Sequence, residues 1–211
     1  MAILTIASRA DLALVLPVIL GTMYVSHRNP AHDIPIEYED VESLRDHESA
    51  CLTTGKGQRI TDAAILCYLM NNLDTSASKR ITEWLHRSTQ LAVPDLKELE
   101  HPMMNLESHL TLRSHIVGYS LTLADLAVWG VLRGNTVTTS LRMTYVNINR
   151  WFTFIEASNP WICTALESLN SAACRKKVAA SPVSASFKTG LKNTASGIVT
   201  RLVKPMMHHS D

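Results

Sequence analysis

The sequence is poor in the residues that mark specialised proteins. Of its 211 residues, 18% are charged, 6% are aromatic and four are cysteines, against an ordinary hydrophobic share of 46%. Such a composition excludes a disordered chain and a coiled coil. Because Cys51, Cys67, Cys163 and Cys174 form no C-x-x-C pair and are too few for a disulfide scaffold, we expect reduced, buried thiols, with no metal and no cofactor.

Long hydrophobic runs are also missing. The strongest candidate, Leu12–Val25, is interrupted by Pro17 and Gly21, and it is shorter than the roughly 20 apolar residues that a membrane span needs. It lacks the basic start and small-x-small cleavage site of a signal peptide, and Asp11 directly precedes it. We therefore expect a cytoplasmic protein that does not contact a membrane.

The formal net charge of +1 conceals an uneven distribution. Residues 1–174 carry 13 Lys/Arg and 18 Asp/Glu, a net charge of −5, whereas residues 175–211 carry seven basic side chains and one acidic. The acidic segment Asp33–Glu48 predicts a solvated edge, or a surface that steers a basic partner. The basic tail predicts weak, salt-dependent contact with nucleic-acid phosphates.

Residues 1–74 predict a small α/β domain. The β-branched run Ala2–Ile6 predicts a buried strand, and Pro17–His27 predicts a buried helix with Pro17 at its first position. Alternation over Ile34–Glu39 predicts another strand. The runs around Gly55-Lys56-Gly57 predict a hairpin, and a helix follows from Thr61 with a buried stripe of Ala64, Ile65, Tyr68 and Leu69.

Residues 75–174 predict an all-helical domain, because apolar residues recur there at helical spacing. Successive helices are predicted at 81–91, 96–110, 123–133 and 148–155, with a fifth beginning at Pro160. Beyond Arg175 the chain shows no sustained period, so residues 175–211 predict a basic linker.

The best-defined local motif lies at Thr122–Asp125. Thr122 is a natural N-cap, and Asp125 stands three residues later, where its carboxylate reaches back to the N–H of the cap. We expect this capping box to fix the start of a buried helix. Its predicted role is structural, and no residue of the chain is assigned a catalytic role.

Two segments resemble a known family. Leu112–Asn135, with its Val-Trp…Leu-Arg-Gly-Asn run, and Arg150–Glu156, with its Arg-Trp-Phe, resemble the glutathione-transferase-like N-terminal domain of eukaryotic, fungal-type cytosolic glutamyl-tRNA synthetases. The resemblance implies a glutathione-transferase-like fold of two domains. The N-terminal half would be an abridged thioredoxin-like domain, because Glu39–Ala50 is short for a crossover helix.

The tail carries part of the same resemblance. Thr189–Lys192 and Ser196–Arg201 resemble the segment that leads into the catalytic domain of these synthetases, but no His-Ile-Gly-His signature follows. The resemblance therefore implies a non-catalytic appendage of a glutamate–tRNA ligase. Its implied role is to dock the synthetase to another transferase-like domain, in a multi-synthetase or tRNA-binding-cofactor assembly. The resemblance also implies that the nucleic acid contacted weakly by the basic tail is tRNA.

The residues expected to dock lie on the helix around 148–158. Its core stripe takes Ile148, Trp151, Phe152 and Ile155, which places Arg150, Phe154 and Ala157 on the opposite face, with Asn149 beside Arg150. An outward Phe beside an Arg is typical of the centre of an interface. Alternatively, a neighbouring helix covers Phe154 and Arg150 is a solvated charge. The resemblance favours the interface, because such domains dock through this helix.

A small glutathione S-transferase is the alternative function. Such an enzyme needs a hydroxyl or thiol near the end of the first strand, and Ser8 has this position. It also needs an anion-binding Ser at the start of the third helix of its fold, where this chain has Thr61-Asp62. A carboxylate there would repel the γ-glutamyl carboxylate of glutathione, so we expect docking rather than transferase chemistry.

Overall fold

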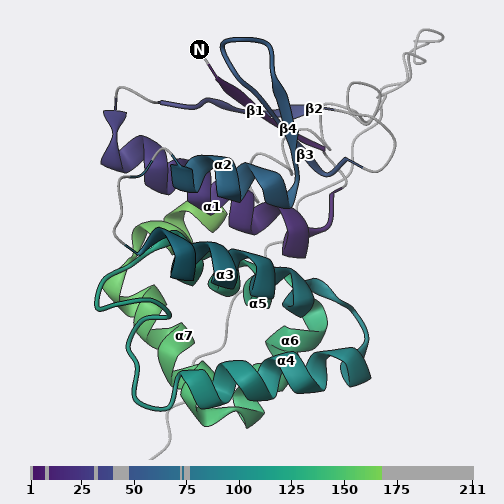
Figure 1. Ribbon diagram of the computed structural model, residues 1–211. Coiled ribbons are helices and arrows are strands. Elements are labelled where there is room, and N and C mark those ends of the chain that lie inside the picture. The colour runs from purple at the N-terminus through teal and green to yellow at the C-terminus, as the bar shows by residue number, and fades with distance from the viewer. Residues whose placement is uncertain are drawn as a thin grey trace, which may run out of the picture.

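The fold consists of a small mixed sheet with two covering helices, followed by a helical bundle (Figure 1). The computed structural model describes residues 2–7, 10–30, 33–39, 48–71, 73 and 77–167. The predicted order of an α/β half and an all-helical half is confirmed. The predicted boundary near residue 74 and the tail at 175–211 lie outside the described residues, as do Ser8 and Cys174.

The sheet has the strand order β2-β1-β3-β4. Strand β1 (Ile3–Ala7) pairs in parallel with β2 (Ile36–Glu39) and antiparallel with β3 (Ala50–Thr53), which pairs with β4 (Arg59–Thr61) as the predicted hairpin. Helices α1 (Leu12–Arg28) and α2 (Ala63–Asn71) lie between the sheet and the remaining helices (Figure 1).

The helical half forms around α5 (Leu123–Gly134), which is buried along nearly its whole length. It also contains α3 (Ser78–Thr89), η2 (Gln90–Ala92), α4 (Leu96–His109), α6 (Thr136–Leu141), η3 (Arg142–Thr144) and α7 (Val146–Ser158). A last helix is described over 161–167. The stripes predicted for the helices at 81–91, 96–110 and 148–155 are buried except for Leu96, which is 56% exposed at the first position of α4, because amphipathic helices turn their apolar side to the core.

Helices α1 and α5 join the two halves at a crossing too close for side chains. A Cβ built on Gly134 would lie 2.5 Å from the backbone nitrogen of Ala13, and one on Gly130 would lie 2.9 Å from the nitrogen of Pro17. The prediction that Pro17 begins α1 is wrong, since the helix starts at Leu12 with Asp11 as its N-cap. Pro17 sits inside α1, where its missing N–H removes one helical hydrogen bond and its backbone packs against Gly130.

Three smaller expectations also need correction. The buried stripe of α2 consists of Ile65, Leu66, Leu69 and Met70, whereas Ala64 is exposed and Tyr68 half-buried. The thiol of Cys51 is buried as expected, but Cys67 is half-buried and Cys163 is exposed. Helix α6 was not predicted, because Gly134-Asn135 signals the end of α5 while the Asn135 side chain also caps α6 by accepting from the N–H of Val137 (2.9 Å).

No helix in the described ranges has the length and apolar character needed to cross a membrane.

Candidate protein-docking surface

The outer side of α7 carries the residues predicted to dock. Arg150, Phe154 and Ala157 are exposed and Asn149 is half-buried, opposite the buried stripe of α7. Phe154 keeps 38% of its surface exposed and meets the His115 ring edge-on, with ring centroids 5.5 Å apart. We call Arg150, Phe154, Ala157 and His115 the α7 face.

The Arg150 guanidinium is not a free solvated charge. Its Nη2 donates to the carbonyl of Leu110 at 2.6 Å and to that of Arg113 at 3.2 Å. Leu110 is the C-cap of α4, where backbone carbonyls lack helical partners and the helix dipole is negative. Arg150 therefore ties α7 to the end of α4.

Glu107 makes the reciprocal connection from α4 to α7. Its carboxylate accepts from the backbone N–H groups of Asn147 and Ile148, both at 2.9 Å, and from the side-chain amide of Asn147 at 2.8 Å. These N–H groups belong to the first turn of α7, where the helix dipole is positive. Helix α4 therefore supplies a negative charge to the N-terminal end of α7, and α7 supplies the positive charge of Arg150 to the C-terminal end of α4.

The loop that connects α4 to α5 borders the α7 face and is held by further side chains. His109 Nε2 donates to the carbonyl of Ile116 at 2.9 Å, and the Asp125 carboxylate accepts from the N–H of Ile116 at 2.8 Å. The Tyr24 hydroxyl on α1 donates to the carbonyl of Leu121 at 2.9 Å. Since side chains of α1, α4, α5 and α7 anchor this loop, the surface it forms is preorganised.

Asp125 also holds the start of α5. Its carboxylate accepts from the N–H of Thr122 at 3.0 Å and from the Thr122 hydroxyl at 2.8 Å, within a capping box. Asp125 is fully buried. Burial raises the pKa of its carboxyl, and the three hydrogen bonds oppose that rise. The bond to Ile116 could not be inferred from the spacing of the capping box.

Apolar side chains stand exposed on the loop beside the α7 face. Leu112 is 95% exposed and Tyr119 is 97% exposed. Neither residue could be identified as a contact residue from the sequence, because a Leu or Tyr in a loop carries no periodic signal. Exposed aromatic and aliphatic side chains beside an arginine match the composition of interface centres.

Asp62, which was considered in relation to glutathione binding, holds the backbone of a neighbouring strand. Asp62 adopts a left-handed conformation (φ 48°), and its Oδ1 accepts from the N–H groups of Ser49 (3.0 Å) and Ala50 (3.1 Å). This carboxylate therefore fixes the entrance to β3. Within the described residues, no cluster of three His, Cys, Asp or Glu side chains could hold a metal.

Replacing Glu107 by alanine is expected to lower the free energy of unfolding by about 2 kcal/mol, since it leaves partly buried N–H groups of α7 without an acceptor. Urea denaturation followed by circular dichroism measures the loss. Glu100→Ala, at an exposed position of the same helix, is the control and should stay within about 0.5 kcal/mol of the parent. Equal stability of the two variants would show that the cap of α7 contributes nothing.

His109 predicts a pH dependence of stability. Burial, and secondarily the charges of Arg113 and Arg87, lower the pKa of His109 below 6.5. The unfolded chain then binds the proton more tightly, so stability is complete above pH 6.5 and falls as the pH drops towards the folded pKa. Denaturation at pH 7.5 and 5.0 should show a smaller acid-induced loss for His109→Gln than for the parent, and an equal loss would refute this assignment.

The sequence of this chain is similar to part of several glutamate–tRNA ligases. No family model matches the chain. It is 32% identical over 125 residues to a probable cytoplasmic glutamate–tRNA ligase of Schizosaccharomyces pombe, covering 57% of this chain and 17% of that protein. It is 32% identical over 151 residues to the bifunctional glutamate/proline–tRNA ligase of Mus musculus, covering 63% of this chain and 10% of that protein.

The resemblance to cytoplasmic glutamate–tRNA ligases is thus confirmed over part of the chain. The Saccharomyces cerevisiae cytoplasmic glutamate–tRNA ligase matches as well, at 30% identity over 87 residues, covering 39% of this chain and 12% of that protein. The chain spans less than a fifth of the length of each of these relatives.

Solved structures establish the fold. One from a study of yeast aminoacyl-tRNA synthetase complex formation superposes with a TM-score of 0.69 at 22% identity, covering 85% of this chain and 99% of that one. A delta-class glutathione transferase of Nilaparvata lugens superposes with a TM-score of 0.60 at 18% identity, covering 84% of this chain and 99% of that one. The predicted glutathione-transferase-like fold is therefore confirmed.

Proposed function

We propose that this chain is a protein-docking domain of a cytoplasmic glutamate–tRNA ligase and takes no part in catalysis itself. It joins the synthetase to another glutathione-transferase-like domain through the α7 face. The observation that carries the proposal is the preorganised surface around Phe154, whose loop and helix are anchored from four helices. A surface held rigid before binding loses less conformational entropy when a partner docks.

The relatives support the choice of partner class. They are glutamate–tRNA ligases, and a structural neighbour comes from work on yeast aminoacyl-tRNA synthetase complex formation, based on crystal structures of two binary sub-complexes. We extend both properties to this chain, together with the cytoplasmic location of the relatives. The predicted contact of the tail with tRNA falls outside the described residues.

Within the α7 face, Arg150 acts mainly as a positioning residue. Its guanidinium is bound to two backbone carbonyls, so replacing it alters the end of α4 as well as the surface. Phe154 and Ala157 are better probes of the contact surface. The Phe154 ring is partly exposed, and Ala157 is an exposed residue whose methyl group makes no hydrogen bond, so replacing it disturbs the fold little.

Ala157→Glu is expected to weaken binding to a glutathione-transferase-like domain of a synthetase complex at least tenfold, since it places an unpaired charge in the interface. Phe154→Ala is expected to weaken it by about tenfold, as for an aromatic residue at an interface centre. Isothermal titration calorimetry with the purified partner domain measures both effects.

Ala64→Glu is the matched control, because it makes the same change at an exposed position of α2. It should leave the dissociation constant within twofold of the parent. Binding that is lost with Ala64→Glu and kept with Ala157→Glu would place the interface elsewhere.

Glutathione transferase activity is the second candidate and rests on the fold alone. Retention on glutathione resin together with turnover of chlorodinitrobenzene, both abolished by Ser8→Ala, would establish it. We rank it lower because the Asp62 carboxylate at the start of α2 already accepts two backbone hydrogen bonds and would repel an anionic ligand.

A further inference from the structure

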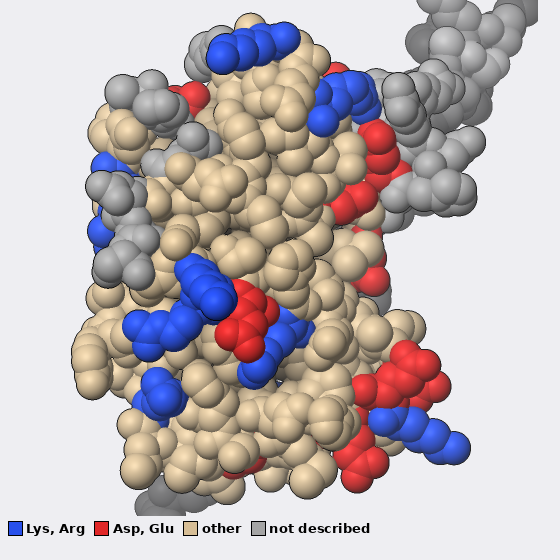
Figure 2. Space-filling view, viewed as in Figure 1, with Lys and Arg blue, Asp and Glu red and all other residues tan. Residues whose placement is uncertain are grey.

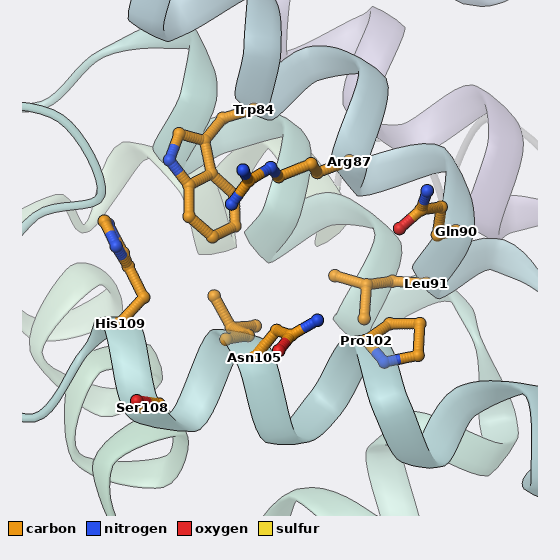
Figure 3. A pocket seen from close by; sticks show the side chains of 9 residues that line it. Trp84, Arg87, Gln90, Leu91, Pro102, Asn105, Ser108 and His109 are labelled. Carbon is orange, nitrogen blue, oxygen red and sulfur yellow. The ribbon is translucent and has the colours of Figure 1, made fainter.

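A groove that borders the loop beside the α7 face runs between α3 and α4. Its main part is a cleft of about 490 Å³ lined from the two sides by Trp84, Arg87, Gln90, Leu91, Pro102, Asn105, Leu106, Ser108 and His109 (Figure 3). A second hollow of about 350 Å³ lies between Arg80, also on α3, and the loop residues Leu112, Arg113, Ser114, Gly118 and Tyr119. We call the two together the α3–α4 groove.

Positive charge dominates the groove. Arg80, Arg87 and Arg113 line it, and the charges of Arg87 and Arg113 both reach His109 and lower its pKa. The acidic side chain of α3 is Glu83, which pairs with Arg87 at 2.6 Å. Figure 2 shows basic side chains on either side of acidic ones over α3, in the middle of the face. This basic island lies on a body, residues 1–174, whose net charge is −5.

The groove also offers accessible hydrogen-bonding groups. Trp84, Leu91 and Leu106 line the cleft but are at most 7% exposed, so the surface that a ligand would meet is mainly polar. The side chains of Gln90 and Ser108 line the cleft and make no hydrogen bond within the part of the chain that the structure describes. An amide and a hydroxyl without protein partners can donate hydrogen bonds to the carbonyls of an extended peptide and accept them from its N–H groups.

We infer that the α3–α4 groove binds an acidic, extended peptide segment of a partner protein. Arg80 and Arg87 are seven residues apart on one face of α3, about 10.5 Å along the helix axis. On a peptide extended in the polyproline II conformation, carboxylates three residues apart lie on one face, about 9 Å apart. The groove has none of the four residues of the α7 face in its lining and meets that face at the loop between α4 and α5, so a segment bound there would add to docking through α7.

A nucleic acid fits this groove less well. Single strands bind proteins largely by stacking bases on exposed aromatic rings. The Trp84 ring is 7% exposed, with the Arg87 guanidinium 5.1 Å from its centroid and the His109 ring at 4.5 Å. Tyr119 is exposed, but a single exposed ring can stack with only one base.

Fluorescence anisotropy tests the inference with three dye-labelled probes at low salt. These are the nonapeptide (Glu-Glu-Leu)₃, its neutral counterpart (Gln-Gln-Leu)₃, and a ten-nucleotide oligouridylate. The acidic peptide is expected to bind at least tenfold more tightly than the neutral peptide, and more tightly than the oligouridylate. Arg80→Gln/Arg87→Gln is expected to weaken acidic-peptide binding at least tenfold.

Two further variants separate this site from general effects. Arg80→Gln/Arg113→Gln leaves the contact between Arg87 and Trp84 intact and should also weaken binding, whereas Lys97→Gln, an exposed cation at the start of α4, should not. Phe154→Ala should leave peptide binding unchanged, so failure here is distinguishable from failure of the α7 face. Equal affinity for the two peptides, tighter binding of the oligouridylate, or unchanged binding by both double variants would overturn the inference.

Discussion

Gly134→Ala is expected to lower the free energy of unfolding by about 3 kcal/mol, because two helical backbones must separate to admit one methyl group. The new Cβ would lie 2.5 Å from the nitrogen of Ala13 and 2.6 Å from the carbonyl oxygen of Leu12. Both neighbours are backbone atoms in the first turn of α1, which cannot rotate aside as a side chain can. The better helix propensity of alanine, about 1 kcal/mol, offsets only part of the loss.

Gly21→Ala provides the matched control, since it makes the same change inside α1. The nearest atom to its new Cβ, at 2.8 Å, is Cδ2 of Leu66, the end of a flexible side chain. We expect this variant to change stability by less than about 1 kcal/mol. Urea denaturation followed by circular dichroism compares the three proteins. A Gly134→Ala variant as stable as the parent would contradict the close crossing of α1 and α5.

Asp125→Ala is expected to lower the free energy of unfolding by a similar amount, about 3 kcal/mol. The substitution removes the acceptor from the N–H groups of Ile116 and Thr122, and each buried donor left unpaired costs about 1–3 kcal/mol. It also releases the centre of the loop between α4 and α5. We therefore expect the loop, as well as the start of α5, to exchange its amide hydrogens faster.

Asp95→Ala tests whether this loss exceeds that of an ordinary helix cap. Asp95 caps α4 by accepting from the N–H of Lys97 at 2.7 Å, at an exposed position. Its removal is expected to cost about 1 kcal/mol. If thermal denaturation shows equal losses for the two variants, the additional role of Asp125 in holding Ile116 would be excluded.

The helical half could be predicted largely from the sequence. In α3, α4 and α7 the apolar residues recur at helical spacing, and all four predicted core residues of α7 are buried. The strands were found because β-branched alternation and the Gly55-Lys56-Gly57 turn are local signals. Such signals come from the buried side of one element and need no knowledge of its neighbours.

Features that depend on contacts between elements could not be predicted in this way. Pro17 inside α1 is tolerated beside Gly130 of α5, more than a hundred positions away in the chain. Arg150 faces outward, as its spacing indicated, but its guanidinium turns back to Leu110. The anchors of the loop likewise come from four helices, and the spacing within one helix contains no information about them.

These anchors give the docking proposal its physical basis. Glu107 and Arg150 fix α7 against α4, while His109 and Asp125 hold Ile116 from two sides. Phe154 and His115 therefore meet in one defined geometry without a partner present. A surface of this kind binds by complementary shape, and weakening its supports should reduce affinity even where the contacting side chains are unchanged.

Hydroxyl-radical footprinting of the complex with another glutathione-transferase-like domain of a synthetase assembly tests the central claim most directly. Binding should protect Phe154 and His115 from oxidation at least severalfold, while Met104, which is 58% exposed on α4, should react as in the free protein. If Phe154 and His115 oxidise equally fast in the free and bound chain, the α7 face is not where this protein docks.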